Sequence, residues 1–325
     1  SNIYYICEAI SMSLATEKEF KNIHEFIERR LGGRKPASDE ELNQLIQEYM
    51  DQTNTMLEAQ EPLTEETAED VFDWLELAGR ARSKKVQRRY LEKAKELEPK
   101  NLDVLSALLF LDKRAYHEYL PDVERLLALG KEDLRERKIY QQSVGDFYQV
   151  LETRPYIRLM HMYMFLLQQC MMLRKAIAVG KEILKLNCSD NLGVRYTLMH
   201  LYVYMEDEYN ALKLMRQFKE ADDTAGFQLP LALLYFQEGK SEEAKGVLKR
   251  LSTTYRGFRS FLKDAAELRL LDESEYIDEY QLYTESELVS CYQENLFLWD
   301  SRQEFFQWAR KAMTPPRKKK EQTTT

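Results

Sequence analysis

Glycine and proline are scarce in this chain, with 11 Gly and 8 Pro among 325 residues. Both residues interrupt regular structure, glycine through its conformational freedom and proline through its fixed φ and missing N–H. Leu, Glu, Lys, Ala, Arg and Gln recur instead, and these residues lose little rotamer freedom in a helix. The composition therefore predicts an all-α chain, long enough for two or three compact domains or for one stack of repeated helices.

Cysteine is also rare, since only Cys7, Cys170, Cys188 and Cys291 occur, far apart in the chain. No C-x-x-C pair and no His at metal-ligand spacing accompanies them, so the sequence supports neither a zinc site nor a disulfide framework. No apolar run approaches the about 18 residues that span a bilayer, and the first residues lack a signal-peptide pattern. We therefore expect a cytoplasmic protein with reduced thiols and no membrane partner.

The charge is nearly balanced, with 47 basic and 55 acidic residues and a net charge of −8. This balance argues against a surface built as a whole to follow nucleic-acid phosphates. One basic run stands apart, made of Arg317, Lys318, Lys319 and Lys320. A solvated tail is the favoured interpretation of this run, and a contact with RNA or a ribosome is the alternative.

The common catalytic motifs are missing as well. The chain contains no G-x-x-x-x-G-K-[ST], no G-x-G-x-x-G, no H-E-x-x-H and no G-x-S-x-G. Its many carboxylate pairs lie on amphipathic helical patterns, where they usually form solvated faces. The sequence therefore predicts a protein that is not an enzyme and needs no metal or cofactor.

Apolar periodicity and breaks divide the chain into five segments. These are an N-terminal helical segment (1–62), a degenerate helical-repeat region (63–153), three helical repeats (154–257), a C-terminal helical cap (258–313) and a disordered basic tail (314–325). We expect separate helices at 3–14 and 20–31, the second stopped by Gly32 and Gly33. Capping-box spacing predicts a helix from Ser38 to about residue 59 and another after Thr284.

The clearest repeat lies between residues 154 and 255. A small residue recurs at Ala176, Ala211 and Ala244, after 35 and then 33 residues. These intervals bracket the repeat of about 34 residues that is typical of stacked helix pairs. The turn before the last of these helices contains Gly239, and Ser241 is expected to cap the helix.

This region resembles the tetratricopeptide-repeat superfamily, and more narrowly a group of bacterial repeat proteins with no assigned biochemical activity. The resemblance rests on Arg154-Pro155-Tyr156, on Asp190-Asn191-Leu192-Gly193-Val194-Arg195-Tyr196 and on a C-terminal stretch from Asn295 to Trp299 followed by Phe306 and Trp308. It implies a right-handed α-α superhelix with N-terminal and C-terminal helical extensions. The family name indicates architecture and is a poor guide to function.

The resemblance also implies a groove lined by the first helix of each repeat. The family's groove positions correspond here to Arg158, His161, Phe165, Gln168, Gln169, Tyr196, His200, Val203, Tyr204, Leu229, Leu233, Phe236 and Gln237. These side chains are mostly apolar and aromatic, which suits an amphipathic helix or an extended peptide. The alternative is that the chain's own helices fill the groove and make it ordinary core.

Two further features have a functional and a structural interpretation. His161 and His200 occupy related positions, but without a third ligand they are better explained as neutral, hydrogen-bonded imidazoles. Arg195 could recognise an anion at a helix N-terminus. Capping by Asp190 and Asn191, with an inter-repeat hydrogen bond from Arg195, is the favoured interpretation.

The leading functional hypothesis is a non-catalytic scaffold or adaptor that binds a peptide segment of another protein through the concave face of its repeats. The second hypothesis is a regulatory protein that senses a ligand or peptide. The third is an RNA- or ribosome-associated protein that acts through Arg317 to Lys320. The identity of the partner does not follow from the residues.

Overall fold

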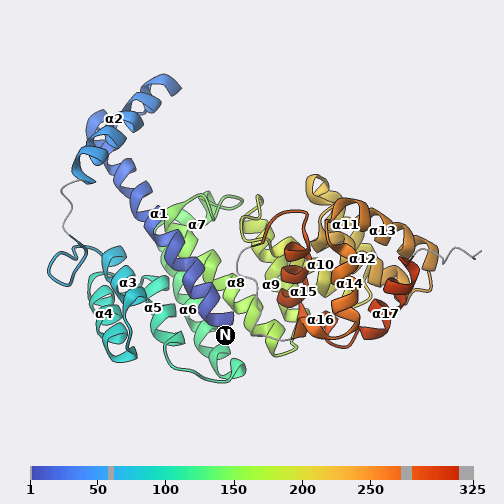
Figure 1. Ribbon diagram of the computed structural model, residues 1–325. Coiled ribbons are helices and arrows are strands. Elements are labelled where there is room, and N and C mark those ends of the chain that lie inside the picture. Colours follow the sequence, from blue (N-terminus) through green and yellow to red (C-terminus); the bar gives the residue numbers. More distant parts are fainter. Residues whose placement is uncertain (1, 58–61, 272–279, 315–325) are drawn as a thin grey trace, which may run out of the picture. The chain divides into compact units, whose positions relative to one another are not determined.

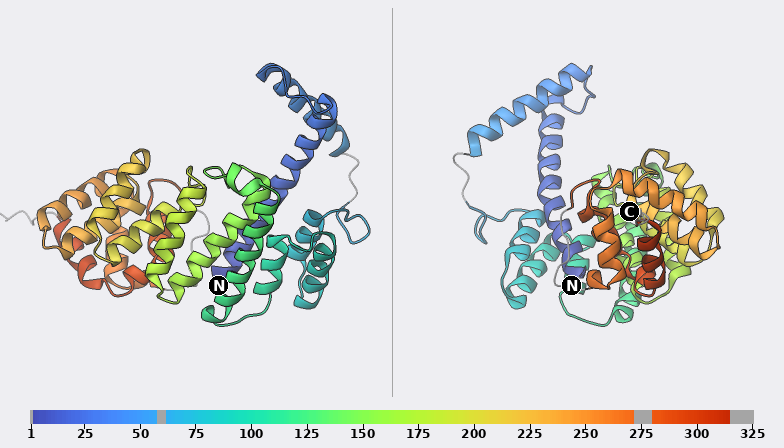
Figure 2. Two further views of the ribbon diagram at one scale, coloured as in Figure 1. Left: turned by 180° about the vertical axis from the view of Figure 1, so that it is seen from behind. Right: turned by 45° about the vertical axis from the view of Figure 1, so that its right-hand side comes forward.

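A computed structural model describes residues 2–57, 62–271 and 280–314. The described residues contain seventeen α-helices and no β-strand, and the structure is 74% helical. The all-α prediction is therefore confirmed. The chain divides into two compact units, residues 1–166 and 167–325, and successive helices run back and forth within each of them (Figures 1 and 2).

Unit 1 contains the first seven helices and most of the eighth. They are α1 (Asn2–Leu31), α2 (Asp39–Leu57), α3 (Val71–Arg80), α4 (Lys84–Leu97), α5 (Leu102–Phe110), α6 (Tyr116–Glu136), the single turn α7 (Ile139–Gln142), the 3-10 turn η1 (Leu151–Thr153) and α8 (Arg154–Gln169).

The N-terminal segment forms one long helix, so the predicted break between residues 14 and 20 is wrong. No glycine or proline stands between the two expected helices, and the intervening residues are compatible with a continuous helix. Helix α1 ends where Gly32 and Gly33 adopt φ values of +61° and +86°. In α2 the predicted cap is confirmed, because Ser38 accepts from the amide of Glu41 at 3.3 Å. The predicted end near residue 59 lies outside the described residues.

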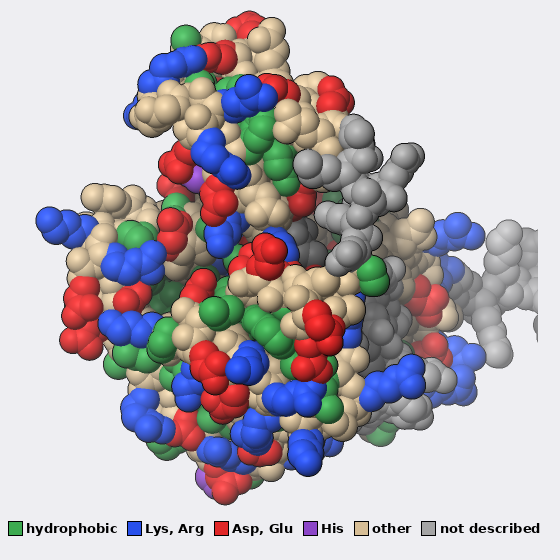
Figure 3. All heavy atoms as spheres, turned by 90° about the vertical axis from the view of Figure 1, so that its left-hand side faces the viewer, with side chains coloured by type: hydrophobic (Ala, Val, Ile, Leu, Met, Phe, Trp, Pro, Cys, Tyr) green, Lys and Arg blue, Asp and Glu red, His purple; other side chains and the backbone are tan. Residues whose placement is uncertain are grey.

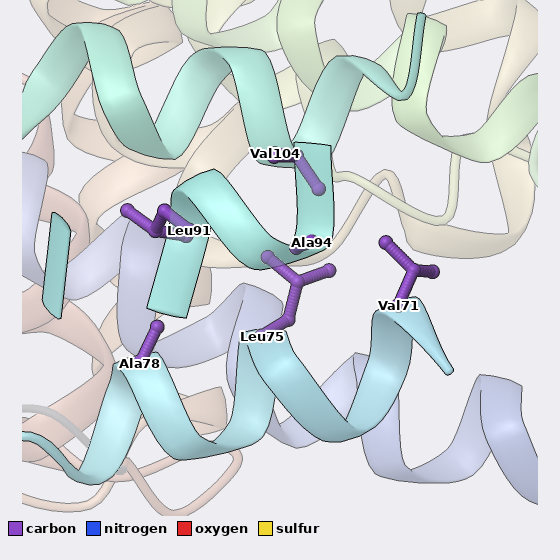
Figure 4. Close-up of a cluster of buried hydrophobic side chains, with 6 residues drawn as sticks. All are labelled: Val71, Leu75, Ala78, Leu91, Ala94 and Val104. Atoms are coloured by element: carbon purple, nitrogen blue, oxygen red, sulfur yellow. The ribbon is translucent and has the colours of Figure 1, made fainter. Parts of the chain in front are cut away.

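Helices α3, α4 and α5 share a compact apolar core. Figure 4 shows their buried side chains, Val71, Leu75, Ala78, Leu91, Ala94 and Val104, directed toward one another. Leu91 is 2% exposed, and burying a side chain of this size stabilises the fold by about 1.5–3 kcal/mol. The small Ala94 lets α4 approach its neighbours closely, and Pro99, which cannot continue a helical hydrogen-bond ladder, follows the end of α4.

Unit 2 contains the end of α8 and the remaining helices. They are α9 (Leu173–Leu186), α10 (Val194–Tyr204), α11 (Glu208–Gln217), η2 (Lys219–Ala221), α12 (Ala225–Gln237), α13 (Ser241–Thr254), α14 (Phe258–Ala266), η3 (Arg269–Leu271), α15 (Glu285–Glu294), α16 (Leu296–Trp299) and α17 (Gln303–Ala312). The recurring Ala176, Ala211 and Ala244 lie on α9, α11 and α13 and are fully buried.

At the start of α10, Asp190 and Arg195 have the structural role that the sequence favoured over anion recognition. The Asp190 carboxylate accepts from the amides of Val194 at 2.8 Å and Arg195 at 3.0 Å, which confirms its predicted role as a cap. The Arg195 side chain pairs with Asp190 at 2.9 Å and with Glu220 at 3.3 Å. Asn191 does not cap the helix as predicted, because its side-chain oxygen accepts from Ser189.

Two other predicted caps in unit 2 are wrong. Helix α13 begins at Ser241 itself, so the Ser241 hydroxyl lies one residue too late to accept from the first free amides, and it makes no capping bond. Thr284 precedes α15, but its hydroxyl donates to the carbonyl of Gln281 at 2.7 Å. The Glu287 carboxylate instead accepts from the Tyr283 amide at 2.6 Å.

The described helices were also compared with the requirements of a bilayer. None of them combines the length and the apolar character that a membrane crossing demands.

Candidate functional site

The predicted groove residues of unit 2 lie beneath its own C-terminal helices. His200 and Val203 on α10, and Leu229 and Leu233 on α12, are 0% exposed. Helices α15 and α16 pack against α12 and α10, respectively. In unit 2 the chain's own helices therefore fill this region, as in the alternative to an open peptide groove.

Aromatic side chains close this face. The ring of Phe236 on α12 lies 5.5 Å from that of Phe305 and 4.8 Å from that of Trp308, both on α17. Tyr204 on α10 lies 6.0 Å from Phe297. Each ring pair contributes about 0.5–1.5 kcal/mol beyond the apolar area it buries. The aromatic stretch at the C-terminal end therefore belongs to the core of unit 2.

The remaining predicted residues of this region differ in exposure. Tyr196 is half-buried and lies 5.3 Å from Phe227, and Gly226 leaves the space that its ring occupies. Gln168 is buried, whereas Gln169 and Gln237 are exposed. These residues therefore do not form one continuous open surface within unit 2.

His200 and Cys291 form the nearest approach to a catalytic pair in unit 2. The Cys291 Sγ lies 3.7 Å from His200 Nε2, and His200 Nδ1 lies 2.7 Å from the carbonyl oxygen of Tyr196. Burial lowers the pKa of His200 to about 4, and burial together with nearby carboxylates raises the pKa of the Cys291 thiol well above its ordinary value. The pair is therefore a neutral imidazole beside a protonated thiol, whereas nucleophilic cysteines use a thiolate.

Arg158, the first predicted groove residue, lies in a buried ion cluster of unit 1. Its guanidinium donates to both carboxylate oxygens of Asp103, at 3.2 Å and 2.6 Å, and pairs with Glu17 of α1. All three side chains are less than 9% exposed. Arg154 adds a second cation, 3.3 Å from Glu17. Glu17 of α1 therefore lies against Arg158, the first residue of the expected peptide groove.

The charges of this cluster depend on one another. Burial disfavours the charged form of Arg158, but the carboxylates of Asp103 and Glu17 outweigh it and raise the pKa of the guanidinium. Burial raises the pKa of Asp103, and Arg158 opposes that rise. A buried carboxylate is tolerated here because a bidentate cation satisfies it.

His161 and Phe165 lie further along α8 and are half-buried. Burial lowers the pKa of His161 to about 4, which agrees with the neutral imidazole expected for this residue. The ring of Phe165 makes an edge contact with Tyr116, at 5.9 Å between centroids.

An open groove lies beside α1 in unit 1. Its volume is about 940 Å³, and its walls are α1, α3, the segment between α4 and α5, the start of α5, α6, η1 and the start of α8. Its apolar lining consists of Phe72, Leu75, Pro99, Leu102, Leu134, Leu151, Pro155 and Tyr156. Its charged lining consists of Glu17, Lys21, Glu25, Glu28, Glu98, Lys100, Asp103, Asp133, Arg137 and Glu152. We call this surface the α1 groove.

A second groove of unit 1 has a different rim. It encloses about 630 Å³ between α4, α5 and α6, over a floor of Leu105, Leu108, Leu109, Leu126 and Leu129. Its charged lining is Arg88, Glu92, Lys95, Arg114, Asp122 and Arg125. Both grooves therefore combine an apolar floor with a charged rim, but cations outnumber carboxylates only in the second.

The sequence analysis missed the α1 groove. Its walls come from segments separated by up to about 140 positions, whereas a repeat pattern compares residues one repeat apart. One local signal was present, because Glu17, Lys21, Glu25 and Glu28 recur at helical spacing and so share one face of α1. The predicted residues of the basic run, Arg317 to Lys320, lie outside the described residues.

In the three described ranges, no group of three or more His, Cys, Asp or Glu side chains is arranged to hold a metal ion. Comparison with family models, curated proteins and solved structures found no match for this chain.

Proposed function

We propose that this protein is a non-catalytic interaction protein of the tetratricopeptide-repeat type, which holds a peptide segment of another protein in the α1 groove. The proposal keeps the right-handed stack of helix pairs and the cytoplasmic location expected from the sequence. It moves the binding surface from α10 and α12 to the walls of the α1 groove. The observation that carries it is an open groove with an apolar floor between helices of different pairs.

The size of the groove supports this assignment. Its volume of about 940 Å³ is at the upper end of the range of about 300–1,000 Å³ found for ligand pockets, so it accommodates several side chains. The groove offers Leu151 and Phe72 as half-buried apolar contacts and carboxylates and amines around them. An apolar centre with a polar rim is the arrangement on which peptide-binding surfaces depend.

Peptide selection tests the proposal. A displayed library of random peptides is selected on the full chain, and the affinity of a selected peptide is measured by fluorescence anisotropy. Leu151→Gln removes an apolar contact of the groove and should weaken binding about tenfold, which corresponds to about 1.4 kcal/mol. Leu97→Gln makes the same change at an exposed side chain outside the groove lining and should leave the affinity unaltered.

Circular dichroism and thermal melting show whether both variants fold. Selected peptides that bind folded Leu151→Gln and wild type equally well would contradict the assignment of the groove. Failure to select any peptide would contradict the proposed function itself.

A further inference from the structure

We infer that the segment bound in the α1 groove is basic and amphipathic, with apolar side chains on the floor of the groove and Lys or Arg side chains at its rim. This inference rests on the proposed function and specifies the chemistry of the partner. It depends on the distribution of charge around the groove and on which of those charges are already compensated.

Carboxylates outnumber cations in the lining of the groove, seven to three. Three of the carboxylates are compensated within the protein. Glu17 and Asp103 pair with Arg158, and Asp133 pairs with Lys100 at 3.4 Å and with Arg137 at 3.2 Å. These ion pairs also use two of the three cations of the lining.

The other four carboxylates, those of Glu25, Glu28, Glu98 and Glu152, are exposed. Within the described part of the chain, no Lys or Arg lies in ion-pair distance of any of them. The third cation of the lining, Lys21, lies over the ring of Phe72 at 5.6 Å. The rim is therefore negative where a partner would approach it.

These four carboxylates belong to different walls, and Glu28 also lies 3.3 Å from the Nε2 atom of His24 on the same helix. Glu25 and Glu28 lie on α1, Glu98 follows α4, and Glu152 lies in η1. They stand beside apolar side chains such as Leu151 and Pro99. A segment that enters the groove can therefore bury apolar side chains while its cations reach carboxylates on more than one wall.

The charge of this rim differs from that of the second groove of unit 1. Acidic and basic side chains are interspersed on the face drawn in Figure 3. The second groove of unit 1 has four cations against two carboxylates. Because the field of the α1 groove repels phosphates, it disfavours nucleic acid and favours a basic peptide.

Three synthetic peptides test the inference. Each is a helical peptide of about 14 residues, or four turns, with the same Leu and Phe anchors, and the flanking positions carry Lys, Gln or Glu. The Lys peptide should bind the full chain most tightly. Its affinity should fall as NaCl is raised from about 0.05 to 0.5 M, because salt screens exposed charges.

A matched pair of triple variants locates the effect. The variant Glu25→Gln/Glu28→Gln/Glu152→Gln should bind the Lys peptide about tenfold more weakly, because it removes three exposed carboxylates of the rim, and the Gln peptide with unchanged affinity. The control Glu19→Gln/Glu69→Gln/Glu132→Gln removes the same charge from exposed residues outside the groove lining and should behave as wild type.

The outcomes separate this inference from the proposed function. If the Gln or Glu peptide binds more tightly than the Lys peptide, and Leu151→Gln weakens that binding, the groove is retained and a basic partner is excluded. If both triple variants weaken the Lys peptide equally, the attraction comes from net charge and the inference is overturned. If no peptide is sensitive to Leu151→Gln, the proposed function fails with it.

Discussion

The two units cover their predicted groove residues with different chemistry. In unit 2 the positions on α10 and α12 are apolar or aromatic, and α15, α16 and α17 cover them with aromatic side chains. In unit 1 the first predicted groove residue is Arg158, and α1 covers it with the carboxylate of Glu17. The predicted groove residues therefore contribute to a closed apolar core in one unit and to a buried ion cluster in the other.

The difference teaches how a groove remains open. An apolar surface can pack against any other apolar side chain. The C-terminal helices α15–α17 can therefore pack over the whole apolar face of α10 and α12 in unit 2. A buried cation needs carboxylates at fixed positions, and the helix that supplies Glu17 also carries exposed charged residues such as Glu25 and Glu28. These residues stay in contact with water, and the α1 groove lies beside them.

The largest expected loss of stability comes from disrupting the buried ion cluster that joins α1 to Arg158 in unit 1. Arg158→Met leaves Glu17 and Asp103 buried without their bidentate partner, and it should lower the free energy of unfolding by about 3–5 kcal/mol. Urea denaturation at pH 7 measures this change. Arg30→Met breaks an exposed ion pair with Glu48 and should cost less than about 1 kcal/mol.

A triple substitution separates charge from shape at this site. In Glu17→Leu/Asp103→Leu/Arg158→Met all three charges are replaced by apolar groups, which should restore much of the lost stability. If Arg158→Met is as stable as wild type, the buried ion cluster does not hold α1 in place.

The next largest loss of stability is expected from disrupting the packing of the C-terminal helices of unit 2 on α10 and α12. Trp299 is 1% exposed and lies 5.4 Å from His200 and 6.3 Å from Tyr292. Trp299→Ala should lower the free energy of unfolding by about 3–4 kcal/mol through lost burial and the cavity it leaves. Trp308→Ala, at a half-buried position, should cost less, and equal losses for the two variants would show that Trp299 does not hold the cover in place.

The smallest effect, for a fall of one pH unit below 6.5, is a pH dependence that both units share. The folded-state pKa of His200 and of His161 is about 4, below the ordinary value of 6.5. Between these values the unfolded state binds protons that the folded state does not, so stability falls as pH is lowered from 6.5 to 4. Each ring contributes a slope of at most about 1.4 kcal/mol per pH unit.

His200→Asn keeps a donor for the Tyr196 carbonyl but does not titrate. It should therefore reduce the loss of stability at acid pH, as measured by urea denaturation at several pH values between 4 and 7. His161→Asn makes the corresponding change in unit 1. An acid response unchanged in either variant would show that the ring in question is accessible to protons in the folded state.

Much of the local structure was predictable. The scarcity of glycine and proline indicated helices, and Gly32, Gly33 and Pro99 marked real helix ends. Capping was predicted with mixed success, since Asp190 caps α10 but Ser241 does not cap α13. A shift of one residue decides whether a hydroxyl reaches a free amide, and local sequence does not determine helix ends to that precision.

The candidate site was much less predictable. Arg158 was identified as a groove residue, but its partners Glu17 and Asp103 lie 141 and 55 residues away and carry no local pattern that links them to it. The apolar positions Leu229 and Leu233 were identified as well, although their spacing is the same whether a peptide or the C-terminal helices cover them. The helical period shows which face of a helix is buried, but it does not show which other segment or partner packs on that face.

The sequence by itself therefore determined the helical character of the chain and the apolar faces that must be buried, because these depend on residues within a few turns of one another. Only the tertiary structure decided what covers each face. It placed α15–α17 over α10 and α12, set α1 against Arg158 and left the α1 groove open. That choice depends on contacts between distant segments, whose burial and charge pairing outweigh any local preference.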